Sequence, residues 1–312
     1  MRDGRMLIGD VRMLIGIAAA LVLILGPLVV GLSGLLRRHR AQLHDGSALP
    51  RWNWRLTASS ALLYALAYNL TFFIQELFLV LPKASLPGVH PTLFHNNHTW
   101  QGDNPLTSLF QGTGALATFI SGALCARRLR RRPPVSTARR LFLIWMTYNG
   151  LLQALSQVVV GALLPANDVG MAMDYLGLGP AGKSLAALLA LVAIPAVALA
   201  LTRRLLALAD APAHLESAHG RSDFIFGIAT LPALLGIVLI IPFRLPRELL
   251  EVLAPPVVVT VIGTAWMQAS AWRLRGTRPD GVAPVGSPLY PLAALLALLL
   301  LFQLVLRPGI RL

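Results

Sequence analysis

The sequence predicts an all-α integral membrane protein, a polytopic bundle of about eight transmembrane helices. Hydrophobic residues make up 56% of the 312 positions and charged residues only 13%, which is far more apolar than an ordinary soluble domain. Apolar stretches recur from end to end, and each is close to the 20 or so helical residues that cross the roughly 30 Å hydrocarbon layer. No polar block between them is long enough to fold apart, so we expect one membrane domain over residues 1–312.

The predicted spans follow one another along the whole chain. The first lacks the small-residue cleavage site of a secretory signal and is longer than a signal's apolar region, so we expect it to be retained. The Pro- and Gly-rich connector before the last span, GTRPDGVAPVGSP, is the one segment expected to be a flexible linker. The eight spans cover residues 13–35, 56–81, 106–126, 141–164, 185–202, 224–243, 252–272 and 288–306.

The basic residues alternate between the connecting segments. Four connectors, at 36–55, 126–140, 203–222 and 273–286, hold 18 of the 27 Lys and Arg residues, and the remaining segments hold 9. Because basic residues resist translocation, the richer connectors are expected in the cytoplasm. We therefore predict a bacterial inner (plasma) membrane protein with both termini extracytoplasmic.

The formal charge of +14 does not indicate nucleic-acid binding. The arginines stand in clusters beside apolar runs, where anionic lipid headgroups and membrane topology account for them. The expected partners are the lipid bilayer and other transmembrane helices. A single cysteine, Cys125, excludes an internal disulfide and any CxxC motif.

Residues Gly177 to Ser184 match the GxxxxGK[ST] pattern of nucleotide-binding P-loops. A working P-loop follows a buried β-strand and opens a helix of an α/β domain, whereas this match lies between a polar loop and a membrane span. We therefore treat it as a chance match and predict no nucleotide binding. On this interpretation the glycines form turns and Ser184 caps the fifth span.

Glu76 is the most informative charged residue, because it lies inside the second predicted span. A carboxylate there costs several kcal/mol unless it is paired. Asn69 and Lys83 lie seven residues before and after it, which places all three on one helix face. Glu76 is either paired with Lys83 as a structural element or is a functional carboxylate, the candidate catalytic residue of the chain.

The loop after the second span contains three of the seven histidines, His90, His95 and His98. The His95-x-x-His98 spacing allows two imidazoles to meet one metal on a turn, and Glu76, His90 or Asp103 could complete the site. Asp168 from the next outer loop could join them. The sequence thus offers a candidate Zn²⁺ or Cu²⁺ site above Glu76. The alternative is that these histidines only line the headgroup region.

Asn149, Gln153 and Gln157 lie on one stripe of the fourth span at i, i+4, i+8 spacing. Amides that face lipid are costly, so the stripe is expected to face other helices or a polar cavity. Asp168 lies three turns beyond Gln157 and would extend the stripe unless Pro165 turns the chain. On the third span Gly114, Thr118 and Gly122 form a small-residue face suited to close helix packing.

The segment Gln75-Glu76-Leu77-Phe78-Leu79 resembles the membrane-embedded HExxH motif of site-2-type zinc proteases in its Glu and its position in a span. Both metal-ligand histidines of that motif are replaced here. Three functions remain open: a metal-binding and hydrolytic site at the extracytoplasmic face, a small-solute permease, and a non-catalytic component of a membrane complex. The first is our leading prediction.

Overall fold

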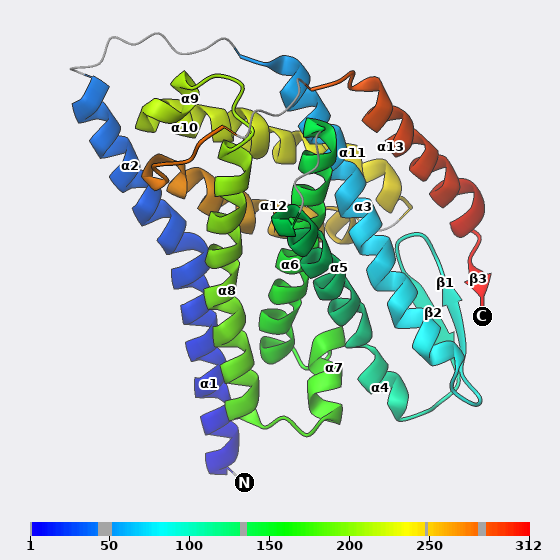
Figure 1. Ribbon diagram of the computed structural model, residues 1–312. Coiled ribbons are helices and arrows are strands. Elements are labelled where there is room, and N and C mark those ends of the chain that lie inside the picture. The colour runs from blue at the N-terminus through cyan, green and yellow to red at the C-terminus, as the bar shows by residue number, and fades with distance from the viewer. Residues whose placement is uncertain (1, 43–51, 132–135, 247–248, 280–284) are drawn as a thin grey trace.

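The computed structural model describes residues 2–42, 52–131, 136–246, 249–279 and 285–312, and within them the chain is predominantly helical (Figure 1). The all-α prediction is therefore confirmed. The helical elements, in chain order, are α1 (Arg2–Ala20), η1 (Leu21–Leu25), α2 (Gly26–Gln42), α3 (Trp54–Ala84), α4 (Leu106–Phe110), α5 (Thr113–Arg131), α6 (Thr137–Leu163), α7 (Asp168–Tyr175), α8 (Pro180–Leu206), α9 (Ala213–Glu216), α10 (Ala218–Ile225), η2 (Phe226–Thr230), α11 (Leu231–Arg244), α12 (Leu249–Ser270), η3 (Ala271–Arg273), α13 (Leu289–Leu301) and η4 (Phe302–Leu306).

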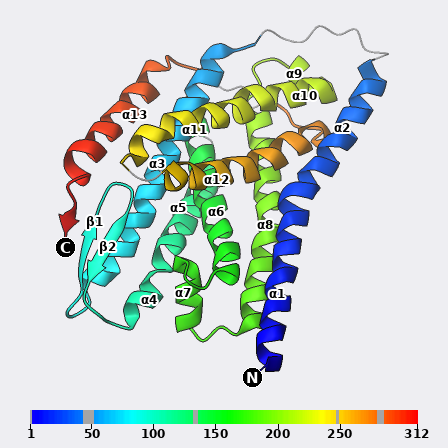
Figure 2. The same ribbon diagram turned by 180° about the vertical axis from the view of Figure 1, so that it is seen from behind.

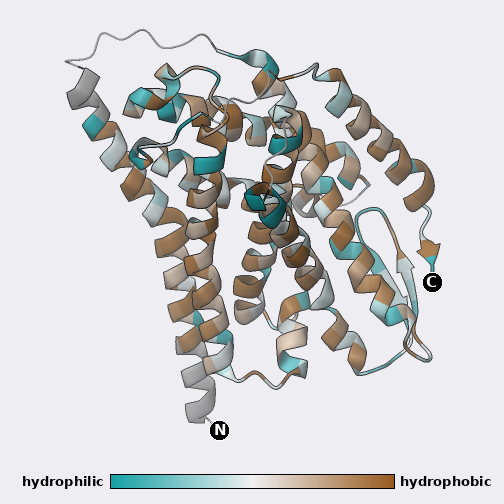
Figure 3. Ribbon diagram, in the orientation of Figure 1, coloured by the Kyte–Doolittle hydropathy of each residue, from teal (hydrophilic) through white to brown (hydrophobic). Residues whose placement is uncertain are grey.

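Seven of the described helical segments are long and apolar enough to cross a membrane, and α6 with α7 forms an eighth, bent by 63° at the break between them. Each predicted stretch overlaps one of these segments, except that the fourth, 141–164, overlaps α6 alone and α7 lies in a predicted outer loop. Most residues of the eight segments are apolar (Figure 3). The seven unbent segments are Val11–Arg37, Trp54–Ala84, Leu106–Arg131, Pro180–Leu206, Ala218–Arg244, Val252–Arg273 and Leu289–Leu306.

The connections fall at two ends of the bundle. The last turns of α5 and α8, the first turns of α3 and α6, and helices α9 and α10 lie in the upper half of Figure 1, and we call this the arginine end. Helices α4 and α7 and the N-terminal end of α1 lie towards the opposite end, as do the strands β1 (His90–Leu93) and β2 (His98–Gln101). We call this the hairpin end. The described parts of the basic connectors thus gather at one end.

Helices α11 and α12 depart from the simple up-and-down arrangement. In both views they run across the direction of α3, α6 and α8 (Figure 2). Hydropathy predicts the length and apolar character of these helices but not their direction. Their crosswise course places α11 against α3, and α12 against α2, α8 and α11.

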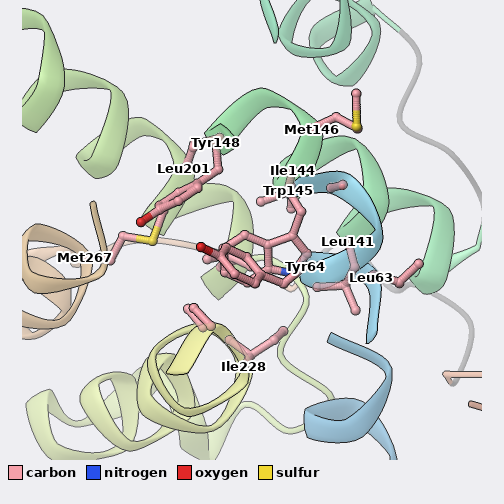
Figure 4. Packing of buried hydrophobic residues seen from close by; sticks show 14 of the residues in the cluster. Leu63, Tyr64, Leu141, Ile144, Trp145, Met146, Tyr148, Leu201, Ile228 and Met267 are labelled. Atoms are coloured by element: carbon pink, nitrogen blue, oxygen red, sulfur yellow. The ribbon is translucent and has the colours of Figure 1, made fainter. Parts of the chain in front are cut away.

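An aromatic cluster joins α3, α6 and α12 at the centre of the molecule (Figure 4). The Tyr64 and Trp145 rings meet edge to face with centroids 4.9 Å apart, and Trp145 and Tyr148 are 5.3 Å apart. Each polar atom has a partner: the indole N–H of Trp145 donates to Ser60 Oγ at 3.0 Å, and the Tyr148 hydroxyl donates to the Thr260 carbonyl at 2.8 Å. The cluster therefore combines apolar burial with satisfied hydrogen bonds.

The N-terminal helix α1–η1–α2 packs along α12 through two matched Gly–Trp contacts. A Cβ on Gly26 would lie 2.6 Å from the Trp266 ring, and one on Gly34 would lie 2.5 Å from the Trp272 ring. Both indole N–H groups donate to carbonyls of the N-terminal helix at 3.1 Å. Its other face exposes large apolar side chains, as expected for a helix in contact with lipid.

The small-residue face of α5 is confirmed as a packing surface. A Cβ on Gly114 would lie 2.7 Å from Leu79 of α3, and one on Gly122 would lie 2.9 Å from the backbone nitrogen of Leu151 in α6. The glycines therefore allow α5 to approach two helices at backbone distance.

A small antiparallel sheet covers the last turns of α3, where the sequence predicted only a loop. Its order is β2-β1-β3, and β3 (Ile310–Arg311) comes from the C-terminal end of the chain. In β1–β2, His90 pairs with Gln101 and Leu93 with His98. The sheet thus ties the α3–α4 connection to the end of the chain.

Candidate functional site

Asn69, Glu76 and Lys83 lie on one buried face of α3, as their seven-residue spacing predicts. Their relative exposures are 3%, 4% and 0%. Two turns of helix separate each of these residues from the next, so each can contact different neighbouring residues along α3. A buried ion is stable only when partners replace the water it has lost, and such partners are present around Glu76 and Lys83.

His98 lies between Glu76 and Lys83 and contacts both. Its Nδ1 is 2.8 Å from Oε2 of Glu76, and its Nε2 is 3.2 Å from Nζ of Lys83. A carboxylate can only accept hydrogen bonds and an ammonium can only donate them. The neutral imidazole therefore carries its proton on Nδ1, donates to Glu76 and accepts from Lys83. We call these three residues the Glu76–His98–Lys83 relay.

The ammonium of Lys83 has two further contacts besides His98. It donates to Oε1 of Gln111, between α4 and α5, at 2.8 Å. It also lies 4.2 Å from the ring centroid of Trp100, within the range of a cation–π interaction. These contacts replace the hydration of a completely buried cation with fixed partners.

The β1–β2 hairpin positions His98 and Trp100 against α3. The two residues are separated by one position in β2, so their side chains point to the same side of the strand, and their rings stack at 5.8 Å. At the open end of the hairpin, Gly102 follows β2 with φ +99°, and a Cβ on it would lie 1.9 Å from the Gly88 carbonyl oxygen. Only glycine fits there.

Asp168 also reaches this cluster, from the first turn of α7. It lies within electrostatic range of His98, Glu76 and Lys83. The bend between α6 and α7 displaces it from the line of α6, so it does not continue the amide stripe as a straight helix would. Asp168 thus adds a second negative charge within electrostatic range of Lys83, and it forms no ion pair with the relay among the described residues.

The other two histidines of the predicted set lie elsewhere. His95 is buried in the turn of the hairpin, where its Nε2–H donates to the Leu245 carbonyl at 3.1 Å beside the ring of Phe302. His90 is exposed at the start of β1. The structure therefore brings Glu76 and His98 into contact, with Asp168 in electrostatic range, but directs His95 towards the end of α11.

Within the described part of the chain, no group of three or more His, Cys, Asp or Glu side chains is arranged to hold a metal ion. Both ring nitrogens of His98 are already engaged, one by a carboxylate and the other by an ammonium. The geometry thus gives no support to the predicted Zn²⁺ or Cu²⁺ site, which stays a prediction.

The amide stripe of α6 faces the interior. Asn149 and Gln153 are buried, and Gln157 donates to Oε1 of Gln75, the neighbour of Glu76, at 2.8 Å. Asn149 Oδ1, Gln153 Oε1 and the Ser156 hydroxyl have no hydrogen-bond partner among the described residues. Such groups each cost about 1–3 kcal/mol when left unpaired.

The P-loop match lies at the hairpin end, on the α7–α8 connection and the first turn of α8. The element before it is the helix α7, and Lys183 forms an ion pair with Asp174 of that helix. Ser184 does not cap α8 as predicted, because the cap is Gly179 and the Ser184 hydroxyl donates to the Pro180 carbonyl at 2.7 Å.

Sequence reasoning did not identify Gln75, Trp100 or Gln111 as members of the site. It considered Lys83 as a direct partner of Glu76, whereas the structure places His98 between them. Trp100 could have been found from the alternating pattern of the hairpin strands. Gln111 has no comparable signal, because its contact with Lys83 depends on the packing of α4 against α3.

The comparisons with known proteins give no match for this chain among protein-family models, curated proteins or solved structures. We therefore infer the function of the protein from the geometry of its site.

Proposed function

We propose that the protein is a multi-pass membrane permease for a small polar solute, in which the Glu76–His98–Lys83 relay exchanges protons during transport. The relay is the observation that carries the proposal. An imidazole that joins a carboxylate to an ammonium can give a proton from Nδ1 while it takes one at Nε2. Ionisable groups buried inside membrane helix bundles are typical of proton and substrate pathways.

The proton transfer balances within the relay. Lys83 passes one proton to Nε2 of His98, and His98 passes its Nδ1 proton to Glu76. The result is a neutral amine, a neutral imidazole in its other tautomer and a carboxylic acid, with the total charge of the three residues unchanged. Because a neutral pair is less costly to bury than two ions, this exchange suits a site from which water is excluded.

The α6 stripe supports a route for a polar solute next to the relay. The unpartnered oxygens of Asn149, Gln153 and Ser156 are acceptor groups along successive turns of α6. The Gln157–Gln75 hydrogen bond connects the end of this stripe to the residue beside Glu76. A solute with hydrogen-bond donors would satisfy these oxygens, and this gives a reason for burying them.

The charge distribution supports an orientation for this site. The hairpin end has few basic residues and the arginine end has many, so the relay belongs to the extracytoplasmic side in the proposed topology. The protons that it exchanges would thus come from outside the cytoplasm.

Proton-coupled uptake into liposomes tests the proposal. Purified protein is reconstituted into liposomes that enclose the pH-sensitive dye pyranine. Amino acids, sugars and mono- and dicarboxylates are then added outside, at a lower external pH. At least one class should acidify the lumen of wild-type liposomes. In Glu76→Gln and His98→Gln the rate should fall by about tenfold or more, since each removes a group that must accept a proton.

Asp103→Asn is the matched control, because Asp103 is exposed in the same α3–α4 connection and takes no part in the relay. Its transport rate should equal that of the wild type. A wild-type protein that moves no protons with any of these solutes contradicts the proposal, and so does a Glu76→Gln variant with unchanged transport.

A hydrolytic site is the second candidate function, favoured by the 2.8 Å contact that orients His98 on the Glu76 carboxylate. If Lys83 moved away from Nε2, the pair would have the arrangement of a general base. Zinc or copper that copurifies stoichiometrically and is lost in His95→Ala and His98→Ala would support the metal-dependent form. A metal-free protein of normal stability would exclude the metal-dependent hydrolytic site.

A further inference from the structure

A second polar feature lies at the arginine end, far along the helices from the relay. It is a cavity of about 570 Å³ between α5, α6, α8 and the segment that follows η3. This volume falls within the roughly 300–1,000 Å³ typical of small-molecule sites. Four arginines line it, namely Arg130, Arg203, Arg204 and Arg278.

The four arginines come from three separate parts of the chain. Arg130 belongs to the end of α5, Arg203 and Arg204 to the last turn of α8, and Arg278 follows Gly276. Gly276 has φ +74°, a left-handed conformation that turns the chain after η3. Membrane topology explains why arginines occur at this end, but it does not require three segments to direct them into one cavity.

The charge of the cavity is entirely positive. No Asp or Glu is among its described lining residues, and the four guanidinium groups have no ion-pair partner in the described part of the chain. All four arginines are exposed, so an anion that enters the cavity can contact them directly, and their combined positive charge favours its binding there. The guanidinium group matches the oxygens of a phosphate with two parallel N–H donors, so a phosphate group is the anion that best suits the site.

The inner part of the cavity is apolar. Leu151 of α6 and Val197 and Leu201 of α8 line it, and all three lie within helices that are apolar enough to sit in a bilayer. A ligand that fills the cavity therefore meets arginines at the outer side and hydrocarbon side chains on the inner side. This combination fits an amphiphile better than a free ion.

We propose that this cavity binds the phosphodiester headgroup of an anionic phospholipid, with the acyl chains lying against α6 and α8. Anionic lipids give the membrane surface a negative potential, which attracts basic residues that lie there. The cavity adds a defined place for one headgroup at the junction of α5, α6 and α8. The inference is independent of the transport proposal, since the two sites share no residue.

Native mass spectrometry of the detergent-solubilised full chain tests this directly. The protein is titrated with dioleoyl-phosphatidylglycerol, dioleoyl-phosphatidylcholine or the soluble sn-glycerol 3-phosphate. We expect wild-type protein to retain phosphatidylglycerol in preference to the other two. In Arg203→Gln/Arg204→Gln its apparent Kd should rise by about tenfold or more, because two charge-assisted hydrogen-bond donors are lost.

Arg55→Gln/Arg139→Gln is the control, since it removes the same charge from exposed arginines at the start of α3 and α6 that do not line the cavity. Its Kd should stay at the wild-type value. Arg130→Gln/Arg278→Gln serves as the second cavity variant if the first does not fold. The proposal is overturned if the Kd for phosphatidylglycerol rises equally in the cavity and control variants. It is also overturned if wild-type protein binds phosphatidylcholine as tightly as phosphatidylglycerol. Glycerol 3-phosphate binding as tightly as the lipid overturns the lipid assignment.

Discussion

Replacing Lys83 with methionine is expected to destabilise the protein by about 3–5 kcal/mol, the usual cost of removing one member of a buried charge pair. Methionine keeps most of the side-chain volume, so the effect reports on charge rather than on a cavity. The ammonium lies beside His98 and Gln111 and within electrostatic range of Glu76 and Asp168. Without it, buried Glu76 and half-buried Asp168 lose the nearby cation. The measurement is the shift of the thermal unfolding midpoint in detergent, which the unfolding enthalpy converts into a change in the free energy of unfolding.

Lys183→Met is the matched control, because Lys183 is a second lysine at the hairpin end and its ion-pair partner, Asp174, is 54% exposed. An exposed pair of this kind contributes about 0–1 kcal/mol. The double variant Lys83→Met/Glu76→Gln should recover part of the loss, since it removes the uncompensated carboxylate along with the cation. Equal destabilisation by Lys83→Met and Lys183→Met would contradict the assigned role of Lys83.

The relay shows which part of a site follows from sequence. Helical periodicity places Asn69, Glu76 and Lys83 on one face of α3, and the cost of burying a charge indicates that they need partners. The identity of those partners depends on the hairpin. His95 and His98 fit a metal-binding spacing in the sequence, but the first lies in the turn and the second begins β2, so they contact different neighbours.

Long-range pairing explains most of what the sequence did not predict. The sheet at the hairpin end joins β1 to β3, more than 200 residues apart, and no local pattern specifies such a contact. The crosswise direction of α11 and α12 also depends on contacts between distant parts of the chain, because α11 packs against α3 and α12 against the N-terminal helix. Hydropathy and charge depend only on local composition, so they could predict the number and length of the apolar helices.

Gly150→Ala is expected to destabilise the protein by about 1–3 kcal/mol, although alanine is the better helix former by about 1 kcal/mol. A Cβ at this position would lie 2.7 Å from the backbone carbonyl oxygen of Thr118 and 2.8 Å from Cα of Gly122. Both atoms belong to the backbone of α5, so no side chain can rotate away. The helices must separate, and the contacts of the small-residue face then weaken together.

Gly16→Ala is the control for this substitution, because Gly16 also lies inside a long helix but has no atom within 4 Å of its added Cβ. There the gain in helix propensity should dominate, and the unfolding midpoint should stay the same or rise. Gly122→Ala tests the same interface from the other side, since its Cβ would lie 2.9 Å from the Leu151 nitrogen. If the unfolding midpoints of Gly150→Ala and Gly122→Ala both matched that of Gly16→Ala, α5 and α6 could not be as close as the structure places them. The position of α5 against α3 would then also need revision, because Gly114 on the same helix sets that contact.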